Sequence, residues 1–221
     1  MREKRSVSVF ISLLCIAAAA AVAEAGSPPA VGGRSIVDNG GFEQWEAAPG
    51  DLQKSMDCAQ LPTRWSVLPR EDRKSYSVHR DAVCKHGGSF SVRLGNTATK
   101  GNLSLVQRTD AEPEYRYVVR LWLKGDHIDA YHPMGVIVHV AASSQTDKKD
   151  TGLWSGILRH SDRTDPPNSG TFDWREFVCI FDTPVDTRSI LLLVELRGAG
   201  VAWVDDVSVT RLEKCKQVES Y

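Results

Sequence analysis

The sequence lacks an excess of either charge, and beyond its first residues it lacks a long apolar stretch. Its 27 Lys and Arg residues nearly balance its 28 Asp and Glu residues, for a formal net charge of −1. A basic surface is the electrostatic mark of a nucleic-acid binder, so this balance argues against nucleic acid as a partner. The apolar run Ser189–Leu196 is only strand-sized, so we expect no membrane span after the N-terminal region.

Motifs of common enzyme classes are also missing. The sequence contains no Gly-x-Ser-x-Gly elbow, no His-Glu-x-x-His motif and no glycine-rich phosphate loop. Glu195 is a conceivable glycosidase acid, but the sequence does not identify a second carboxylate at the required separation. We therefore expect no enzymatic activity, and a small polysaccharide-active enzyme is the weakest alternative.

The first 25 residues have the pattern of a secretory signal peptide. Basic residues Arg2, Lys4 and Arg5 precede an apolar run over 7–22, and Ala23–Ala25 supplies a small-x-small cleavage pattern. An uncleaved membrane anchor is the alternative, but the run is short for a span of about 20 residues. We expect a secreted or extracytoplasmic protein with no membrane association once the signal is cleaved.

Cysteine is scarce after the signal. Four residues follow it: Cys58, Cys84, Cys179 and Cys215. Their spacing matches no compact Cys-x-x-Cys zinc pattern, and an even number in an exported chain favours two disulfides. Four cysteines allow three pairings; pairing each with its nearest neighbour predicts Cys58–Cys84 and Cys179–Cys215.

The rest of the chain is expected to form one domain. A Pro- and Gly-rich linker covers 26–34, the folded domain covers 35–213 and a short tail covers 214–221. Within the domain, apolar and polar residues alternate along short segments between turn-forming residues, which is typical of strands. The expected strands are 34–43, 75–80, 89–96, 102–109, 115–125, 135–143, 173–184, 189–198 and 201–209. Because no long amphipathic helix is expected, the pattern predicts an all-β, antiparallel sandwich of two sheets.

Several motifs also occur in an order that resembles a known family. They are NGGFEQW (39–45), TRWSVL (63–68), HGGSFSVRL (86–94), YVVRLWLK (117–124), DWREFVCIF (173–181) and VDDVSV (204–209). Together they are similar to the secreted carbohydrate-binding modules found beside cellulases and xylanases, which are galactose-binding-domain-like jelly rolls. The resemblance implies a jelly-roll β-sandwich, expected to be monomeric, that binds poly- or oligosaccharide without catalysis.

The resemblance also implies a structural calcium ion. Its ligands would be Glu43, the backbone carbonyl of Gly41, and Asp205 or Asp206; calcium takes about 6–8 oxygen ligands, so this donor set suits it. Strand parity groups Asp205 with Val207 and predicts that it points inward, unless a β-bulge reverses the parity. The alternative is that both aspartates are ordinary strand-end residues, solvated or bonded to backbone N–H groups.

Sugar binding needs flat aromatic rings and planar polar side chains in a preformed groove. Parity places one set of candidates away from the core, expected together on one concave sheet face. They are Trp122, Arg120, Arg93, Glu195 and Arg197, with His139 on the parity of Ile137 and Ala141. Trp154, in the long loop 143–170, is a second aromatic candidate. The alternative is that Trp122 packs under a loop while the charges form weak surface ion pairs.

Three of the remaining tryptophans are given structural roles, and the role of Trp45 is left open. Trp65, Trp174 and Trp203 fall where the resemblance implies core positions, and His86 is expected to be an ordinary surface residue. A second function is kept open, namely an exported structural or protein-interaction sandwich that does not bind sugar.

Overall fold

The computed structural model describes residues 33–70, 73–130, 135–143, 155–159 and 168–215. The chain divides into two units, Met1–Val31 and Gly32–Tyr221, and everything below concerns the second. The predicted signal peptide and the candidate Trp154 lie outside the described residues, so those predictions stay untested.

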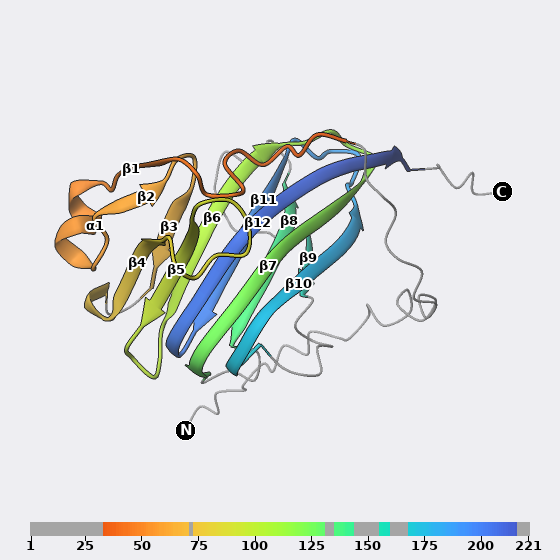
Figure 1. Ribbon diagram of the computed structural model, residues 1–221. Helices are drawn as coiled ribbons and strands as arrows, with labels where there is room; N and C mark the ends of the chain where they lie inside the picture. The colour runs from red at the N-terminus through yellow and green to blue at the C-terminus, as the bar shows by residue number, and fades with distance from the viewer. Residues whose placement is uncertain (1–32, 71–72, 131–134, 144–154, 160–167, 216–221) are drawn as a thin grey trace, which may run out of the picture. The chain divides into compact units, whose positions relative to one another are not determined.

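Two five-stranded sheets form the body of this unit (Figure 1). Sheet I has the order β10 (Gly170–Asp182), β7 (Tyr115–Asp129), β12 (Ala199–Lys214), β5 (Ser91–Asn96) and β4 (Tyr76–Asp81). Sheet II has the order β3 (Ser66–Pro69), β6 (Asn102–Asp110), β11 (Ser189–Arg197), β8 (Val136–Ser143) and β9 (Ser155–Arg159). All strand pairs within the two sheets are antiparallel, so the predicted all-β jelly-roll sandwich is confirmed.

Alternation along the long strands supplies the core between the sheets. On β7, Tyr117, Val119, Leu121 and Leu123 are all at most 3% exposed and pack into one apolar cluster. Sheet II contributes the buried side chains Leu103, Leu105, Val138, Val140, Leu192, Val194 and Leu196 to the same cluster. Successive side chains on a strand point to opposite faces, so this burial fixes which residues face away from the core.

The opening segment 34–43 is not a strand, and that prediction is wrong. Only Ser35 forms a β-bridge, with Thr210, and Asn39 and Phe42 have positive φ angles of 48° and 54°. Two residues in this sparsely populated region turn the chain, which an alternation pattern does not reveal. Phe42 is nevertheless fully buried, with its ring 5.2 Å from that of Trp65.

Several short elements were not anticipated. Helix α1 (Gly50–Ser55), strands β1 (Trp45–Ala47) and β2 (Gln60–Pro62), and the 3-10 turn η1 (Arg73–Ser75) lie beside β3. Each spans six residues or fewer, which is too short to give a clear hydrophobic period.

All four described cysteines are free, so neither predicted disulfide is present. Cys58 packs in the core, whereas Cys84 lies in the β4–β5 loop near Lys124 and Asp173 on the outer side of sheet I. Burial raises the pKa of the Cys58 thiol to about 11, which makes it unreactive at neutral pH.

The second predicted pair is separated in the same way. Cys179 points toward the core, while the Cys215 thiol contacts the carboxylate of Asp182, which is three residues further along the same strand. Residues an odd number apart face opposite sides of a strand, so the two thiols lie on different faces of β10. Neighbourhood in sequence was therefore a poor guide to pairing.

Candidate functional site

A loop between β4 and β5, residues 82–90, crosses the outer face of sheet I over β12 (Figure 1). We call it the β4–β5 loop. Asp205 on β12 holds its middle: one carboxylate oxygen, Oδ2, accepts the N–H groups of His86 at 2.8 Å and Gly87 at 3.1 Å. The other, Oδ1, accepts the N–H of Asp206 at 2.8 Å. Asp205 is fully buried, and this burial raises the pKa of its carboxyl above the ordinary value.

The prediction that Asp205 points into the core is wrong, because a β-bulge reverses the parity of β12. The register with β7 shifts between Asp205 and Ser208, and Asp206 has a φ of 48°. Asp205 pairs with Trp122, which faces outward, while Val204 pairs with the core residue Leu123. The bulge thus places both aspartates at the β4–β5 loop.

Glu43 anchors the end of the same loop. Its Oε1 accepts the N–H of Ser89 at 2.6 Å and of Phe90 at 3.4 Å, and the Ser89 bond lowers the pKa of the Glu43 carboxyl. A Cβ on Gly88 would collide with the Glu43 carboxylate, and one on Gly87 would lie 2.6 Å from Oδ2 of Asp206. The glycine pair lets the loop pass between the two acids.

The first and last segments of the domain therefore converge, as the family resemblance implied. The N–H of Val207 donates to the carbonyl of Gly40 at 2.9 Å, and a Cβ on Gly41 would lie 4.0 Å from Oδ1 of Asp206. Within the described ranges, however, no group of three or more His, Cys, Asp or Glu side chains is arranged to hold a metal ion. Both oxygens of Asp205 already accept N–H groups, so Glu43, the Gly41 carbonyl and Asp206 are the better oxygen donors for calcium.

An aromatic cluster forms where the loop meets β7. The His86 ring stacks on Trp122, with 3.8 Å between centroids and 13° between planes, and meets Trp174 edge-on at 5.8 Å. Its Nδ1 lies 2.7 Å from Oδ2 of Asp206. We call His86, Trp122 and Trp174 the aromatic cluster.

Sequence reasoning missed two members of this cluster. Trp174 was expected in the core, but register shifts over Gly170–Arg175 turn it outward, and His86 was expected to be an ordinary surface residue. The HGG stretch at His86 was the available signal, because paired glycines permit a close approach of the loop to a sheet.

Charged side chains flank the cluster on the same face. Arg120 pairs with Glu176 at 2.9 Å and Lys124 with Asp173 at 2.8 Å. Further along, the Arg93 guanidinium lies 6.0 Å above the ring of Trp203. Trp203 was expected in the core, but it is half-buried on this face, and its Nε1 donates to Asp81 at 2.9 Å.

The predicted grouping of these residues with Glu195 and Arg197 is wrong. Glu195 and Arg197 lie on β11 of sheet II and face away from the core, on the opposite side of the sandwich from Trp122. Parity along a strand identifies the outward residues but not the sheet to which the strand belongs.

Glu195 is the centre of a separate polar triad. Its Oε2 accepts Nε and NH2 of Arg197 at 2.9 and 2.7 Å and lies 3.1 Å from Nε2 of His139. Burial opposes ionisation of Glu195, but the bonds from His139 and Arg197 outweigh it and lower the pKa of the carboxyl to about 2. The side chain is 5% exposed, so the triad is a fixed part of this face.

Comparisons with known proteins agree with the fold. No protein-family model and no curated protein sequence matches the chain. Among solved structures, a proposed sugar-binding protein from Bacteroides thetaiotaomicron is 13% identical, with 81% of this chain and 100% of that chain covered and a TM-score of 0.52. The enzymatically active domain of tailspike protein 4 from bacteriophage CBA120 is 11% identical, with 80% and 21% covered and a TM-score of 0.50.

Carbohydrate-binding modules are among the similar structures. TmCBM61, solved in complex with beta-1,4-galactotriose, is 17% identical, with 81% of this chain and 99% of that chain covered and a TM-score of 0.48. At identities this low, the matches with TM-scores of 0.50 and 0.52 show a shared fold alone, which agrees with the two-sheet jelly-roll β-sandwich described above. Separately, the described residues include no helix long and apolar enough to cross a membrane.

Proposed function

We propose that this protein is a secreted, non-catalytic carbohydrate-binding module. It binds poly- or oligosaccharide on the outer face of sheet I, at the aromatic cluster. The observation that carries the proposal is the stack of His86 on Trp122 with Trp174 beside it, next to the Arg120–Glu176 pair.

The chemistry of this face suits a sugar. Pyranose rings have apolar faces that pack on aromatic rings, and their hydroxyls bond to planar polar side chains such as Arg and Glu. The cluster offers the indoles of Trp122 and Trp174, and Asp205, Asp206 and Glu43 hold the loop that completes it. A face held in place before binding loses less entropy when a ligand arrives.

The similar protein from Bacteroides thetaiotaomicron, named for sugar binding, supports the same ligand class. Secretion rests on the N-terminal sequence pattern, and the absence of enzyme motifs supports a non-catalytic role. The tailspike likeness makes a test of catalysis worthwhile, because that domain is enzymatically active.

A structural calcium ion is a further part of the proposal. The convergence of Glu43, the Gly41 backbone and Asp206 around the glycine pair supports it. The ion would tie the start of the domain to β12 and hold the β4–β5 loop in place.

The proposal is tested by adding purified protein to a glycan array and a panel of polysaccharides. We expect saturable binding in calorimetry, with no release of reducing or unsaturated ends. Absence of both array signal and heat would overturn the ligand assignment, and release of ends that is abolished in Glu195→Ala would overturn the non-catalytic one.

One observation favours a different function, a protein-interaction sandwich without sugar binding. His86 covers one face of the Trp122 indole, so that ring face is not open to a ligand in this arrangement. In our proposal the ligand instead contacts Trp174 and the parts of His86 and Trp122 outside their mutual stack. The His86→Ala variant distinguishes the two functions. A sugar-binding module should bind glycan more weakly in the variant than in the wild type, whereas a protein-interaction sandwich should bind no glycan in either protein.

A further inference from the structure

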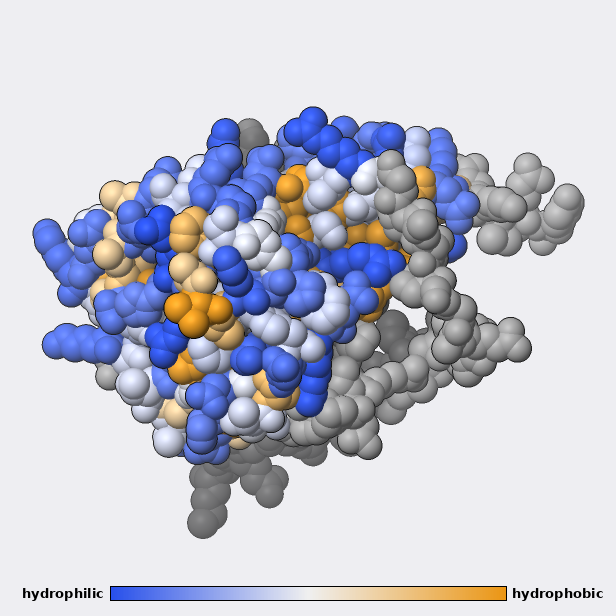
Figure 2. Space-filling view, in the orientation of Figure 1, coloured by the Kyte–Doolittle hydropathy of each residue, from blue (hydrophilic) through white to orange (hydrophobic). Residues whose placement is uncertain are grey.

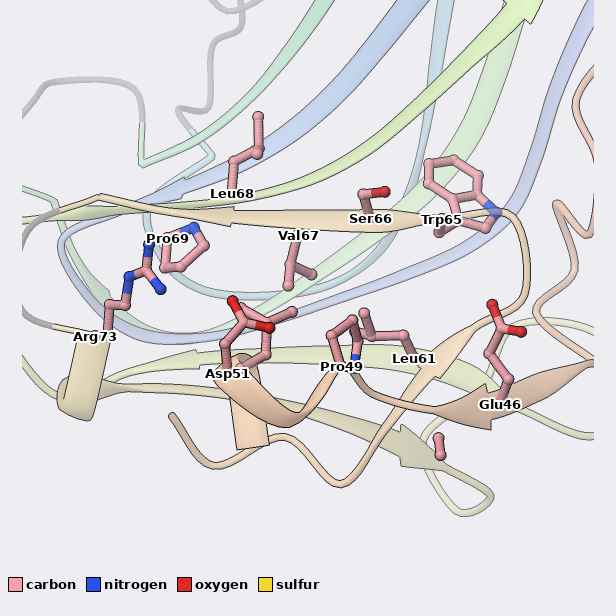
Figure 3. A pocket seen from close by; sticks show the side chains of 12 residues that line it. Glu46, Pro49, Asp51, Leu61, Trp65, Ser66, Val67, Leu68, Pro69 and Arg73 are labelled. Atoms are coloured by element: carbon pink, nitrogen blue, oxygen red, sulfur yellow. The ribbon is translucent and has the colours of Figure 1, made fainter. Parts of the chain in front are cut away.

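A pocket lies beside β3, away from both sites described above (Figure 3). Its volume is about 440 Å³, and it separates β3 from the β1–β2 pair and α1. Pro49, Leu52 and Leu61 form an apolar wall opposite the strand. Pockets that receive ligands usually span about 300–1,000 Å³, so this one can take several side chains.

The strand that borders the pocket is an edge of sheet II. β3 pairs with β6 alone, and the described part of the chain places no strand on its other side. The N–H of Arg70 donates to the carbonyl of Asn102. Since every second residue of an antiparallel strand bonds to its partner strand, the backbone groups of Leu68 and Ser66 also face β6. The N–H and C=O of Val67 therefore point away from β6, along with the C=O of Pro69.

The backbone groups that face outward along this edge include more hydrogen-bond acceptors than donors. Val67 offers one donor and one acceptor, whereas Pro69 has a carbonyl but no N–H. A partner strand must therefore supply most of the donors.

Three charged side chains reach toward this edge from the opposite wall. Figure 3 shows Glu46 of β1, Asp51 of α1 and Arg73 of η1 all pointing toward β3, while Ser66 and Leu68 point away. None of the three forms an ion pair with another described residue, in contrast to the paired Arg120 and Lys124 of sheet I. Among the described residues that line the pocket, two carboxylates face one guanidinium, so the charge of this lining is negative.

We propose that this pocket is a docking site for an extended, basic peptide segment of a partner protein, which adds to β3 as an extra strand. The backbone of the segment bonds to Val67 and Pro69, as in other cases of strand addition to an exposed sheet edge. Its Lys or Arg side chains lay their aliphatic stems on Pro49, Leu52 and Leu61 and direct their charged ends to Glu46 and Asp51. The site is independent of sugar binding, because none of its residues belongs to the aromatic cluster.

The test uses two blocked hexapeptides, acetyl-TKVKVT-amide and acetyl-TEVEVT-amide, with binding measured by fluorescence anisotropy in low salt. We expect the Lys peptide to bind and the Glu peptide not to. Glu46→Gln combined with Asp51→Asn should raise the Kd of the Lys peptide about tenfold or more, which corresponds to about 1.4 kcal/mol. Asp186→Asn, an exposed acid in the β10–β11 turn, is the matched control and should leave the Kd unchanged.

Backbone N-methylation separates strand addition from simple charge attraction. One peptide carries methyl groups on the backbone nitrogens of both Lys residues, and a second carries them on the backbone nitrogens of both Val residues. The N–H groups of these two sets point to opposite edges of the added strand, so only one set can face β3. We expect one methylated peptide to lose binding while the other retains it. Absence of binding, equal loss with both methylation sets, or an unchanged Kd in the Glu46 and Asp51 double variant would overturn the proposal. Circular dichroism checks that the variants are folded.

Discussion

The imidazole of His86 lies parallel to the indole of Trp122, with 3.8 Å between ring centroids and 13° between planes. The two residues come from a loop and from the middle of β7, and Asp206 fixes the imidazole from a third segment at 2.7 Å. In Figure 2, which has the orientation of Figure 1, hydrophilic residues prevail and hydrophobic residues form small patches. An aromatic cluster held by three segments within charged surroundings is the feature on which the proposed binding face rests.

Gly88 tests how tightly the β4–β5 loop is anchored. Its φ is 51°, and an added Cβ would collide with the Glu43 carboxylate, so Gly88→Ala should destabilise the fold by about 1–3 kcal/mol. Urea denaturation measures this change. Gly50→Ala is the matched control, because a Cβ there meets nothing within 4 Å; it should leave stability the same or slightly higher. Equal effects of the two substitutions would contradict the anchoring.

Asp205 is expected to be the most costly acid to replace on this loop. Asp205→Asn keeps the shape but offers one acceptor oxygen in place of two, and its NH2 group would face an N–H donor. Leaving buried donors unpaired should lower the melting temperature, with a loss of about 1–3 kcal/mol. Asp206→Asn, at a half-buried position, should cost less. A larger loss for Asp206→Asn than for Asp205→Asn would show that the assignment is reversed.

Much of the fold could be predicted from the sequence because the long strands are apolar runs between turn-forming residues. On β7 the core-facing residues Tyr117, Val119, Leu121 and Leu123 follow a period of two, whereas β6, β8 and β11 are buried on both faces and are recognised by their length and apolar composition. The site could be predicted only in part. The bulge at Asp206 changed which face Asp205 occupies, and no local pattern signals a bulge of this kind. Trp122 and Glu195 were placed together because strand pairing, which assigns them to different sheets, depends on contacts between distant segments.

Glu195 should make the stability of the protein depend on pH in the acid range. Folding lowers the pKa of the Glu195 carboxyl from the ordinary 4.5 to about 2. As the pH drops, the carboxyl is therefore protonated in the unfolded chain at a higher pH than in the folded protein. The stabilisation is complete above pH 4.5 and is lost progressively toward pH 2, for a total of about 3 kcal/mol. Glu195→Gln should flatten this part of the curve of unfolding free energy against pH. An identical slope in the variant and the wild type would contradict the role of the triad.

Calcium removal tests the proposed metal. If Glu43, the Gly41 carbonyl and Asp206 hold an ion, a chelator should lower the melting temperature and added calcium should restore it. Glu43→Gln should lose this response, whereas Glu176→Gln, on the same face but away from the convergence, should retain it. An unchanged melting temperature with chelator, together with no metal in the purified protein, would show that the backbone N–H bonds stabilise these acids without an ion.

The most direct test of the account compares two tryptophan substitutions in a titration with a polysaccharide that binds the wild type. Trp174→Ala removes an indole from the aromatic cluster, whereas Trp45→Phe alters a half-buried indole on β1 that bonds to the carbonyl of Phe42. We expect Trp174→Ala to weaken binding about tenfold or more, and Trp45→Phe to leave it unchanged, with both variants folded. Unchanged binding in Trp174→Ala and His86→Ala would contradict the claim that the outer face of sheet I binds carbohydrate.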